Sequence, residues 1–374
     1  MSFEPLSLHR HLFQVGKPTP FGIFDSAARL LLARGHALES EEQLDRLVER
    51  EATVDMREVD DTVRKIANAR PEHLPAFWDE SIGAIGRVLR ANPGADFTRS
   101  LDQASRSLAA LIERDPDLAI FQAVRGESGG DHSMYASRHA VHTATAACLA
   151  ATRLGWSAER GRCVLRSALT MNISMAELQN RLANQMTPVT PMQRDEIDSH
   201  PERSAKMLEL AGVADTEWLD AVRQHHEDKS GGGYPSGLTT VNEVAQLVHC
   251  ADTFTAKLSQ RAQRQPMLAD KAARLQFQAS NGNVMTAALI KEFGLYPPGC
   301  AVRLKCGEVG VVMRRGGGVN TPIVAVLTDR SGDPLLSPGR RDTSKTGFAI
   351  VAVIPMSGLK VRIGLEKLIN CAPD

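Results

Sequence analysis

Residues 225–235 read HHEDKSGGGYP, and this stretch is the most informative part of the sequence. Two adjacent histidines end a predicted helix and run directly into a glycine-rich turn. Neighbouring residues on a helix point in different directions, and a buried imidazole needs a polar partner, so the pair is costly as simple core. A metal ion at the helix end could use both rings. The alternative is a surface or capping feature.

Further candidate ligands lie on either side of this stretch. His139 lies in SRHAV and His200 in SHPE, each predicted near a helix boundary, and Asp252 lies in VHCADTF. Neutral imidazoles together with a carboxylate are preferred by iron, manganese, zinc or nickel. The sequence therefore indicates a metal site that uses these three residues with His225 and His226. The alternative is a set of dispersed helical histidines with local hydrogen bonds.

The spacing of apolar residues divides the chain into three regions. Residues 1–95 predict a small α+β region, with short apolar runs over residues 20–38 and an amphipathic helix over 40–51. Residues 96–294 follow helical spacing almost throughout and predict an all-helical bundle. Residues 295–374 predict a small β-rich domain, because short β-branched runs alternate with Gly and Pro clusters. Its expected strands cover residues 301–304, 310–313, 323–327 and 348–353. The chain is therefore predicted to be mainly α.

Composition excludes several classes of protein. The 374 residues include 44 basic and 44 acidic side chains, and a general polyanion binder would carry a basic excess. Aromatic residues make up 5%, too few for surfaces that stack single-stranded nucleic acid. The six scattered cysteines lack a CxxC pair, which argues against a disulfide framework or a zinc ribbon. Neither a membrane-spanning run nor a signal peptide is recognised, so we expect a cytoplasmic protein without a membrane span.

The segment HHEDKSGGGYP resembles the HD-GYP signature HHExxDGxGYP. The motifs RHAVHTA, SHPERSAKML and ADTFTAKLSQRAQR match the neighbouring elements of that family in order and spacing. The resemblance covers about residues 133–293. It implies a bacterial protein with a helical bundle of the HD type. HD-GYP proteins bind two or three metals and hydrolyse the bacterial messenger cyclic di-GMP to pGpG or GMP.

The resemblance also implies roles for particular residues. The positions of family metal ligands are kept at His139, His200, His225, His226 and Asp252. Positions that would contact the nucleotide are kept at Gly231, Gly233, Tyr234, Pro235, Arg261 and Arg264. The glycines could equally make a simple turn, and the arginines could equally be solvated helix residues. Glu227 would be either a spare carboxylate base or a group that orients an imidazole.

The adjacent His-Asp pair of the family is missing. Where HD-GYP proteins have a pattern like AxLLHDIGK, this chain reads ALTMNISM, with Met171 for the histidine, Asn172 for the bridging aspartate and Met175 for the phosphate-binding lysine. Ser230 and Thr255 also replace acidic residues of the family pattern. A neutral amide bridges two divalent cations poorly, because it does not offset their repulsion. We therefore expect no intact catalytic pair and no full binuclear site, with one iron, manganese, zinc or nickel ion instead.

Three hypotheses for function follow. The favoured one is a degenerate HD-GYP member that acts as a cyclic di-GMP receptor or as an interaction platform for other signalling proteins. The second is a metal-dependent phosphodiesterase for cyclic di-GMP with a weakened or mononuclear site. The third is a protein-docking scaffold that works through its terminal regions. Its basic stretch Arg340, Arg341 and Lys345 could equally be a solvated loop.

Overall fold

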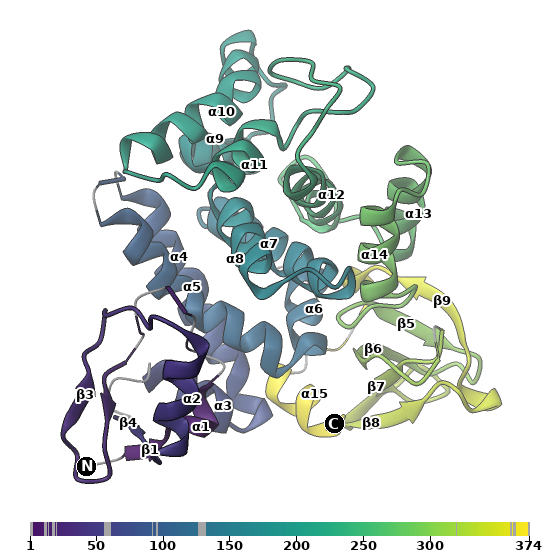
Figure 1. Ribbon diagram of the computed structural model, residues 1–374. Helices are drawn as coiled ribbons and strands as arrows, with labels where there is room; N and C mark the ends of the chain where they lie inside the picture. Colours follow the sequence, from purple (N-terminus) through teal and green to yellow (C-terminus); the bar gives the residue numbers. More distant parts are fainter. Residues whose placement is uncertain are drawn as a thin grey trace. The chain divides into compact units, whose positions relative to one another are not determined.

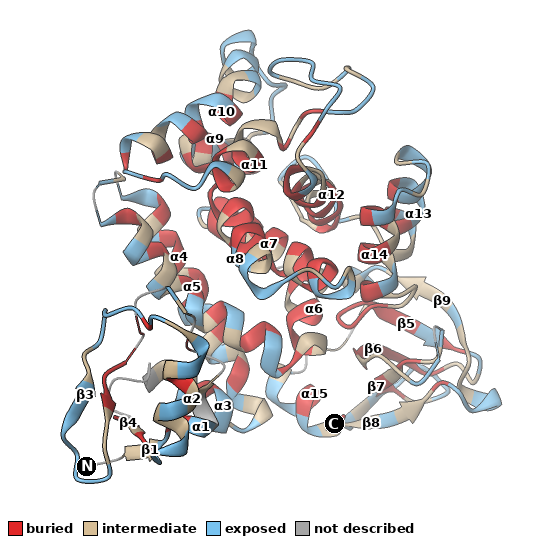
Figure 2. Cartoon of the chain, in the orientation of Figure 1, coloured by how far each residue is buried: buried red, intermediate tan, exposed pale blue. Residues whose placement is uncertain are grey.

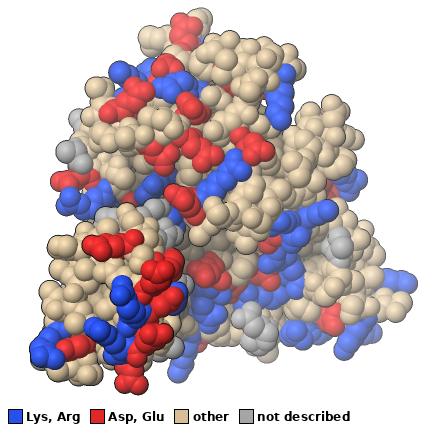
Figure 3. Space-filling model, viewed as in Figure 1, with Lys and Arg blue, Asp and Glu red and all other residues tan. Residues whose placement is uncertain are grey.

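The computed structural model describes residues 3–10, 13, 15–16, 19, 21–55, 61–91, 93–94, 96–125, 132–318, 320–359, 361 and 364–372. The chain divides into two compact units, residues 1–69 and 70–374. The predicted mainly α class is confirmed, with a small sheet in each unit (Figure 1). No helix in the described ranges is both long enough and apolar enough to cross a membrane. Basic and acidic side chains are interspersed on the face shown in Figure 3, as the balanced composition leads one to expect.

The first unit is a small α+β fold. Its antiparallel sheet has the order β1-β4-β2-β3. The strands are β1 (Phe3–Pro5), β2 (Ile23–Phe24), β3 (Leu30–Leu32) and β4 (Thr53–Asp55), and the helices are α1 (Leu6–His9), α2 (Glu41–Glu49) and α3 (Asp61–Asn68). The helix predicted over residues 40–51 is α2, which begins where the Ser40 side chain accepts a hydrogen bond from the backbone N–H of Gln43.

A bundle of helices forms most of the second unit. Its members are α4 (Leu74–Arg90), α5 (Phe97–Arg114), α6 (Pro116–Arg125), α7 (Tyr135–Arg153), α8 (Ala158–Thr170), α9 (Ala176–Asn184), α10 (Pro191–Leu210), α11 (Thr216–Gln224), α12 (Glu243–Leu258), α13 (Ala269–Ala279) and α14 (Val284–Phe293). Helix α7 packs against α4, α6, α8, α9, α12 and α14, and Figure 2 shows it largely buried. Its alanines at helical spacing let these neighbours approach closely: Ala140, Ala144, Ala147 and Ala151 are all buried.

Helix α4 is an element that the sequence analysis did not predict. It lies in the span assigned there to the N-terminal region, and in the structure it packs on α5 and α7 within the second unit. The signal was present in its buried side chains, which recur at the spacing of one helix face: Trp78, Ile82, Ile85 and Leu89.

The last part of the second unit is a five-stranded antiparallel sheet with the order β8-β7-β6-β5-β9. Four strands were predicted: β5 (Ala301–Leu304), β6 (Val309–Arg314), β7 (Ile323–Thr328) and β9 (Ile350–Ile354). Strand β8 (Pro334–Asp342) was missed, and the interpretation of Arg340 and Arg341 as part of a solvated loop is wrong. Because β8 is an edge strand, one side of its backbone needs no ladder donors, so Pro338 is tolerated. A short helix, α15 (Leu365–Cys371), follows.

Ion pairs join this sheet to the helices, and we call them the arginine seam. Arg314 at the end of β6 pairs with Asp115, and the adjacent Arg315 pairs with both Asp117 and Glu292. The side chains of Arg314 and Asp115 are 11% and 4% exposed. Asp115 also accepts a hydrogen bond from the backbone N–H of Leu118 at 2.9 Å and so caps the start of α6. The seam fixes the sheet against α6 and α14.

Candidate metal centre

Three histidines form a compact cluster within the helical bundle. His200, His225 and His226 each place one ring nitrogen within 4.8 Å of the others. Helix α10 supplies the first, and the end of α11 supplies the other two. His200 and His225 are fully buried, whereas His226 is partly exposed. These are side chains that could hold a metal ion.

His200 lies inside α10, so the prediction that it is near a helix boundary is wrong. Pro201 suggested a helix start, but the helix continues through it. Proline has no N–H, so the carbonyl of Ile197, four residues earlier, loses its helical donor. Nδ1 of His200 contacts that same carbonyl oxygen. The Nδ1 atom therefore carries the proton, and Nε2 keeps its lone pair.

His225 is held in the same way at the C-terminal end of α11. Its Nδ1 donates to the carbonyl oxygen of Val222 at 2.7 Å, one of the last carbonyls of the helix that lack an intrahelical donor. Its Nε2 then also carries a lone pair. The Nε2 atoms of His200 and His225 are 3.0 Å apart. Two neutral rings with these tautomers face each other with no proton between them, and only a cation relieves that contact.

A proton is a poor candidate for this cation. Burial lowers the pKa of His200 to about 4 and the pKa of His226 to about 3, and it holds the pKa of His225 well below the usual value. All three rings therefore stay neutral near pH 7. Neutral imidazoles with available ring nitrogens are the form that binds transition metals. The donor set thus fits a metal ion.

The glycine-rich loop after the cluster packs directly against it. The Tyr234 ring stacks on His226 with centroids 4.5 Å apart, and the Tyr234 backbone N–H donates to the His226 carbonyl at 3.1 Å. A Cβ on Gly233 would lie 2.4 Å from the Asp228 backbone nitrogen, so only glycine fits there. Gly231 has a φ of +77°, and Pro235 follows Tyr234 on the exposed side.

Glu227 fixes the glycine-rich loop through backbone hydrogen bonds. It is buried, and its two carboxylate oxygens accept backbone hydrogen bonds from Ser236 at 2.7 Å and from Leu238 at 2.9 Å. These bonds close the loop that carries Tyr234. These contacts make Glu227 a loop-fixing group.

His139 and Asp252 form a second pair of candidate ligands. Nε2 of His139 lies 2.6 Å from an oxygen of Asp252, and both side chains are buried. Burial pushes the pKa of Asp252 up, but the hydrogen bond with His139 and the nearby imidazoles outweigh it and hold that pKa well below the usual value. Nδ1 of His139 is buried without a hydrogen-bond partner. His139 and Asp252 therefore already bond to each other through Nε2 of the ring, while Nδ1 of His139 lacks a partner.

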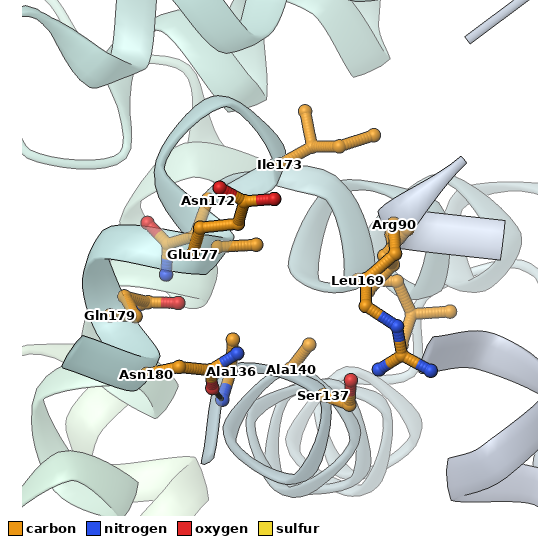
Figure 4. A pocket seen from close by; sticks show the side chains of 12 residues that line it. Arg90, Ala136, Ser137, Ala140, Leu169, Asn172, Ile173, Glu177, Gln179 and Asn180 are labelled. Carbon is orange, nitrogen blue, oxygen red and sulfur yellow. Dashed lines mark hydrogen bonds between the residues drawn. The ribbon is translucent and has the colours of Figure 1, made fainter. Parts of the chain in front are cut away.

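The positions of the missing His-Asp pair, Met171 and Asn172, link the end of α8 to the short 3-10 helix that follows, Ile173–Met175. Met171 and Met175 are buried. Asn172 is also buried, and its side-chain oxygen has no hydrogen-bond partner. It lines a small pocket between α4, α7 and α9 (Figure 4). Asn172 therefore offers a neutral oxygen, and the carboxylate among the residues that line this pocket is that of Glu177.

The two candidate phosphate-binding arginines lie in a turn after α12. Nε and Nη2 of Arg261 donate to the hydroxyl of Tyr135 at 2.9 and 2.7 Å, and the guanidinium also lies over that ring. The ring of Tyr135 stacks in turn on His139 with centroids 5.6 Å apart. Arg264 donates to the carbonyl of Ala256 and is exposed at the surface. Arg261 is thus linked through Tyr135 to the His139–Asp252 pair.

Comparisons with known proteins match the part of the chain that holds this site. The family described as "HD domain" matches residues 108–283, which hold the histidine cluster and the GYP loop. This part of the chain is therefore similar to an HD domain, in line with the HD-GYP resemblance of its motifs. Among curated proteins, the chain is similar to cyclic di-GMP phosphodiesterase PA4108 of Pseudomonas aeruginosa, with 27% identity over 230 residues, or 59% of this chain and 53% of that protein. The chain therefore spans about half the length of this relative.

A solved structure is also similar. The HDG"Y"P protein Bd1817 from Bdellovibrio bacteriovorus matches with a TM-score of 0.49 and 16% identity, over 77% of this chain and 97% of that chain.

Two residues of this site were missed from the sequence. Tyr135 lies four residues before His139 on α7, which puts both on one helix face, and this spacing was a usable signal. His249 lies three residues before Asp252 on α12, and its Nδ1 donates to the His225 carbonyl at 2.7 Å. The contact between His249 and His225 depends on the packing of α12 on α11, so the sequence alone could not predict it.

Proposed function

We propose that this HD-GYP protein is a cyclic di-GMP receptor with a mononuclear metal centre. The observation that carries the proposal is the asymmetry of the site. On one side, the Nε2 lone pairs of His200 and His225 face each other at 3.0 Å beside His226. On the other side, Asn172 stands at the position of the bridging aspartate and Met171 at that of its histidine partner.

The single metal ion would be held by His200, His225 and His226. Iron, manganese, zinc or nickel suits three imidazole donors. When bound, such an ion would attract the phosphate oxygens of a ligand and polarise them. Other groups of the chain orient these three rings. The Ile197 and Val222 carbonyls fix the two buried rings, those of His200 and His225, and Tyr234 fixes His226 by stacking.

Charge argues against a second, closely spaced ion. Two unit charges 4 Å apart interact by about 4 kcal/mol at an effective dielectric constant of 20, so two dications repel by roughly 16 kcal/mol. That figure is as large as the whole binding free energy of a structural zinc ion, about 10–16 kcal/mol. A bridging carboxylate offsets the repulsion, and Asn172 carries no charge to do so. Efficient two-metal hydrolysis is therefore not part of the proposal.

The proposed nucleotide site lies beside the metal. The loop that carries Tyr234 packs against His226, and Arg261 presents a guanidinium suited to phosphate oxygens. The similarity to cyclic di-GMP phosphodiesterase PA4108 supports this ligand. Phosphate binding would compete with the Tyr135 hydroxyl for the same guanidinium N–H groups.

Calorimetry with cyclic di-GMP on metal-loaded protein tests the proposal, with product analysis by chromatography on the same samples. We expect saturable binding without formation of pGpG. Replacing Arg261 with Ala should weaken binding by about 10- to 100-fold, since a hydrogen bond to a charged group is worth about 1.5–3 kcal/mol. Absence of both heat and thermal shift would remove the receptor function.

A mononuclear phosphodiesterase is the second candidate, and the intact cluster of His200, His225 and His226 is the observation that favours it. Turnover of cyclic di-GMP to pGpG in the same samples, lost after treatment with a chelator, would establish this function in place of the receptor.

A further inference from the structure

A fourth histidine, His249, lies beside the cluster and belongs to neither the proposed ligands nor the nucleotide site. It is on α12, one helical turn before Asp252, and is partly buried. Its ring meets His226 edge-on, with centroids 6.0 Å apart and planes at 88°. It falls outside the set of ring nitrogens that lie within 4.8 Å of one another. The ring nitrogens of His249 therefore lie too far from those of His200, His225 and His226 to belong to the same cluster.

The functional atom of His249 is Nδ1. It lies 2.7 Å from the backbone carbonyl oxygen of His225, and a carbonyl accepts only, so Nδ1 carries the proton. His225 is the residue that caps α11, where the last carbonyls have no donor within the helix. Nδ1 of His249 therefore satisfies a carbonyl that the end of α11 leaves open.

The next carbonyl of the chain is held from the other side. The backbone N–H of Tyr234 donates to the His226 carbonyl at 3.1 Å. Both peptide groups of the adjacent His225–His226 pair are thus fixed by elements outside α11: one by α12 through His249, the other by the glycine-rich loop. The His225 ring is fixed separately through Val222. The orientation of two adjacent rings depends on the peptide between them, so these bonds help to set where the two rings lie.

We propose that His249 is a positioning residue, which through Nδ1 holds the His225–His226 backbone in the orientation that binds the metal ion. This inference rests on the proposed metal centre. It gives α12 a role beyond carrying Asp252. Groups that orient metal ligands typically change metal affinity by 10- to 100-fold when removed.

Asparagine and glutamine replacements separate a positioning role from direct ligation. The Asn amide nitrogen lies at the place of Nδ1, whereas the Gln amide reaches the place of Nε2. We therefore expect His249→Asn to keep nearly wild-type affinity for Zn²⁺. His249→Ala and His249→Gln should lose about 10- to 100-fold, measured by competition with a chromophoric chelator.

A matched control lies on the same helix. Thr253 donates to the carbonyl of His249 at 2.9 Å and accepts from the Gln276 side chain at 2.7 Å, so these hydrogen bonds join it to α12 and α13. Thr253→Ala should lower the melting temperature of the metal-free protein about as much as His249→Ala does, without changing Zn²⁺ affinity. A loss of affinity in both variants would indicate general destabilisation and overturn the positioning role.

Two further outcomes decide the proposal. If His249→Gln keeps its Zn²⁺ affinity and His249→Asn loses it, His249 is a direct ligand through Nε2. If His249→Ala keeps its Zn²⁺ affinity, His249 has no part in the site. Either result overturns the inference. Wild-type protein that binds no Zn²⁺ would instead refute the metal centre itself. In the metal-free protein, nitrogen NMR of the imidazoles should show the proton of His249 on Nδ1, and a proton on Nε2 would contradict the bond to His225.

Discussion

The second unit contains two clusters of polar side chains that differ in how their charges and lone pairs are satisfied. In the arginine seam, the charges of Arg314 and Arg315 meet Asp115, Asp117 and Glu292, so cations and anions are paired within the chain. In the histidine cluster, the Nε2 atoms of His200 and His225 lie 3.0 Å apart and both are acceptors. The seam is complete without a ligand, whereas the cluster is not.

This difference shows how buried polar residues with a structural role can be told apart from those that bind a ligand. Buried polar groups are normally satisfied, since an unpaired one costs about 1–3 kcal/mol. The seam follows that rule and explains how the sheet is held. The cluster has its Nδ1 atoms satisfied by the Ile197 and Val222 carbonyls, while its Nε2 atoms face one another. A fixed orientation with an unmet need for a cation indicates a metal site.

The largest expected effect is in the cluster. His225→Ala should abolish measurable Zn²⁺ binding, because it removes the ring that faces His200 and leaves two donors. The matched control is His142→Ala on α7, a histidine outside the ligand set, which should leave Zn²⁺ affinity unchanged. Metal content after desalting, measured by elemental analysis, checks both variants. Normal zinc content in His225→Ala would show that the cluster is not the site.

The seam should respond through stability instead. Asp115→Asn keeps the cap of α6 but removes the charge that pairs with Arg314, and we expect a loss of about 1.5–3 kcal/mol in the free energy of unfolding, the usual contribution of a hydrogen bond to a charged group. Zn²⁺ affinity should be unchanged. The exposed pair of Asp220 and Arg223, 3.4 Å apart, gives a control, since Asp220→Asn should cost less than about 1 kcal/mol. Equal losses in the two variants would contradict the importance assigned to the seam.

An aspartate at position 172 would place a negative charge beside the histidine cluster, as Asp115 does beside Arg314 in the arginine seam. The double replacement Met171→His with Asn172→Asp should allow a second metal ion to bind and should raise hydrolysis of cyclic di-GMP, because a charged bridge offsets the repulsion between two dications. Metal content and product formation are the measurements. If neither changes, the departures from the family extend beyond these two positions.

The smallest expected effect is on pH dependence. Burial lowers the pKa of His200 to about 4 and the pKa of His142 to about 3, below the ordinary value near 6.5. The unfolded chain then binds protons that the folded chain does not, so the stability of the metal-free protein should fall as pH drops from about 6.5 toward 4. Denaturant unfolding at several pH values measures this. His142→Asn should flatten this loss of stability at low pH.

Much of the fold could be predicted because it depends on local pattern. The helical spacing gave the bundle, Ser40 marked the start of α2, and β-branched runs marked four strands of the sheet. Strand β8 was missed because Pro338 and the arginines resemble a loop, and only its edge position explains them. His200 was misplaced because Pro201 usually marks a helix boundary.

The candidate site shows the same limit. The order of motifs identified His200, His225 and His226, which the structure brings together. It could not show that the Ile197 carbonyl has lost its donor to Pro201 and binds His200, or that α12 brings His249 to the His225 carbonyl. Those contacts depend on packing between helices that are distant in sequence, and no spacing rule encodes them.

Metal stoichiometry tests the central claim most directly. Protein equilibrated with excess Zn²⁺ or Mn²⁺, desalted and measured by elemental analysis should contain close to one metal ion per chain, held by His200, His225 and His226. Two ions per chain would contradict the account, because a binuclear centre would then form despite Asn172, and no bound metal would contradict it equally.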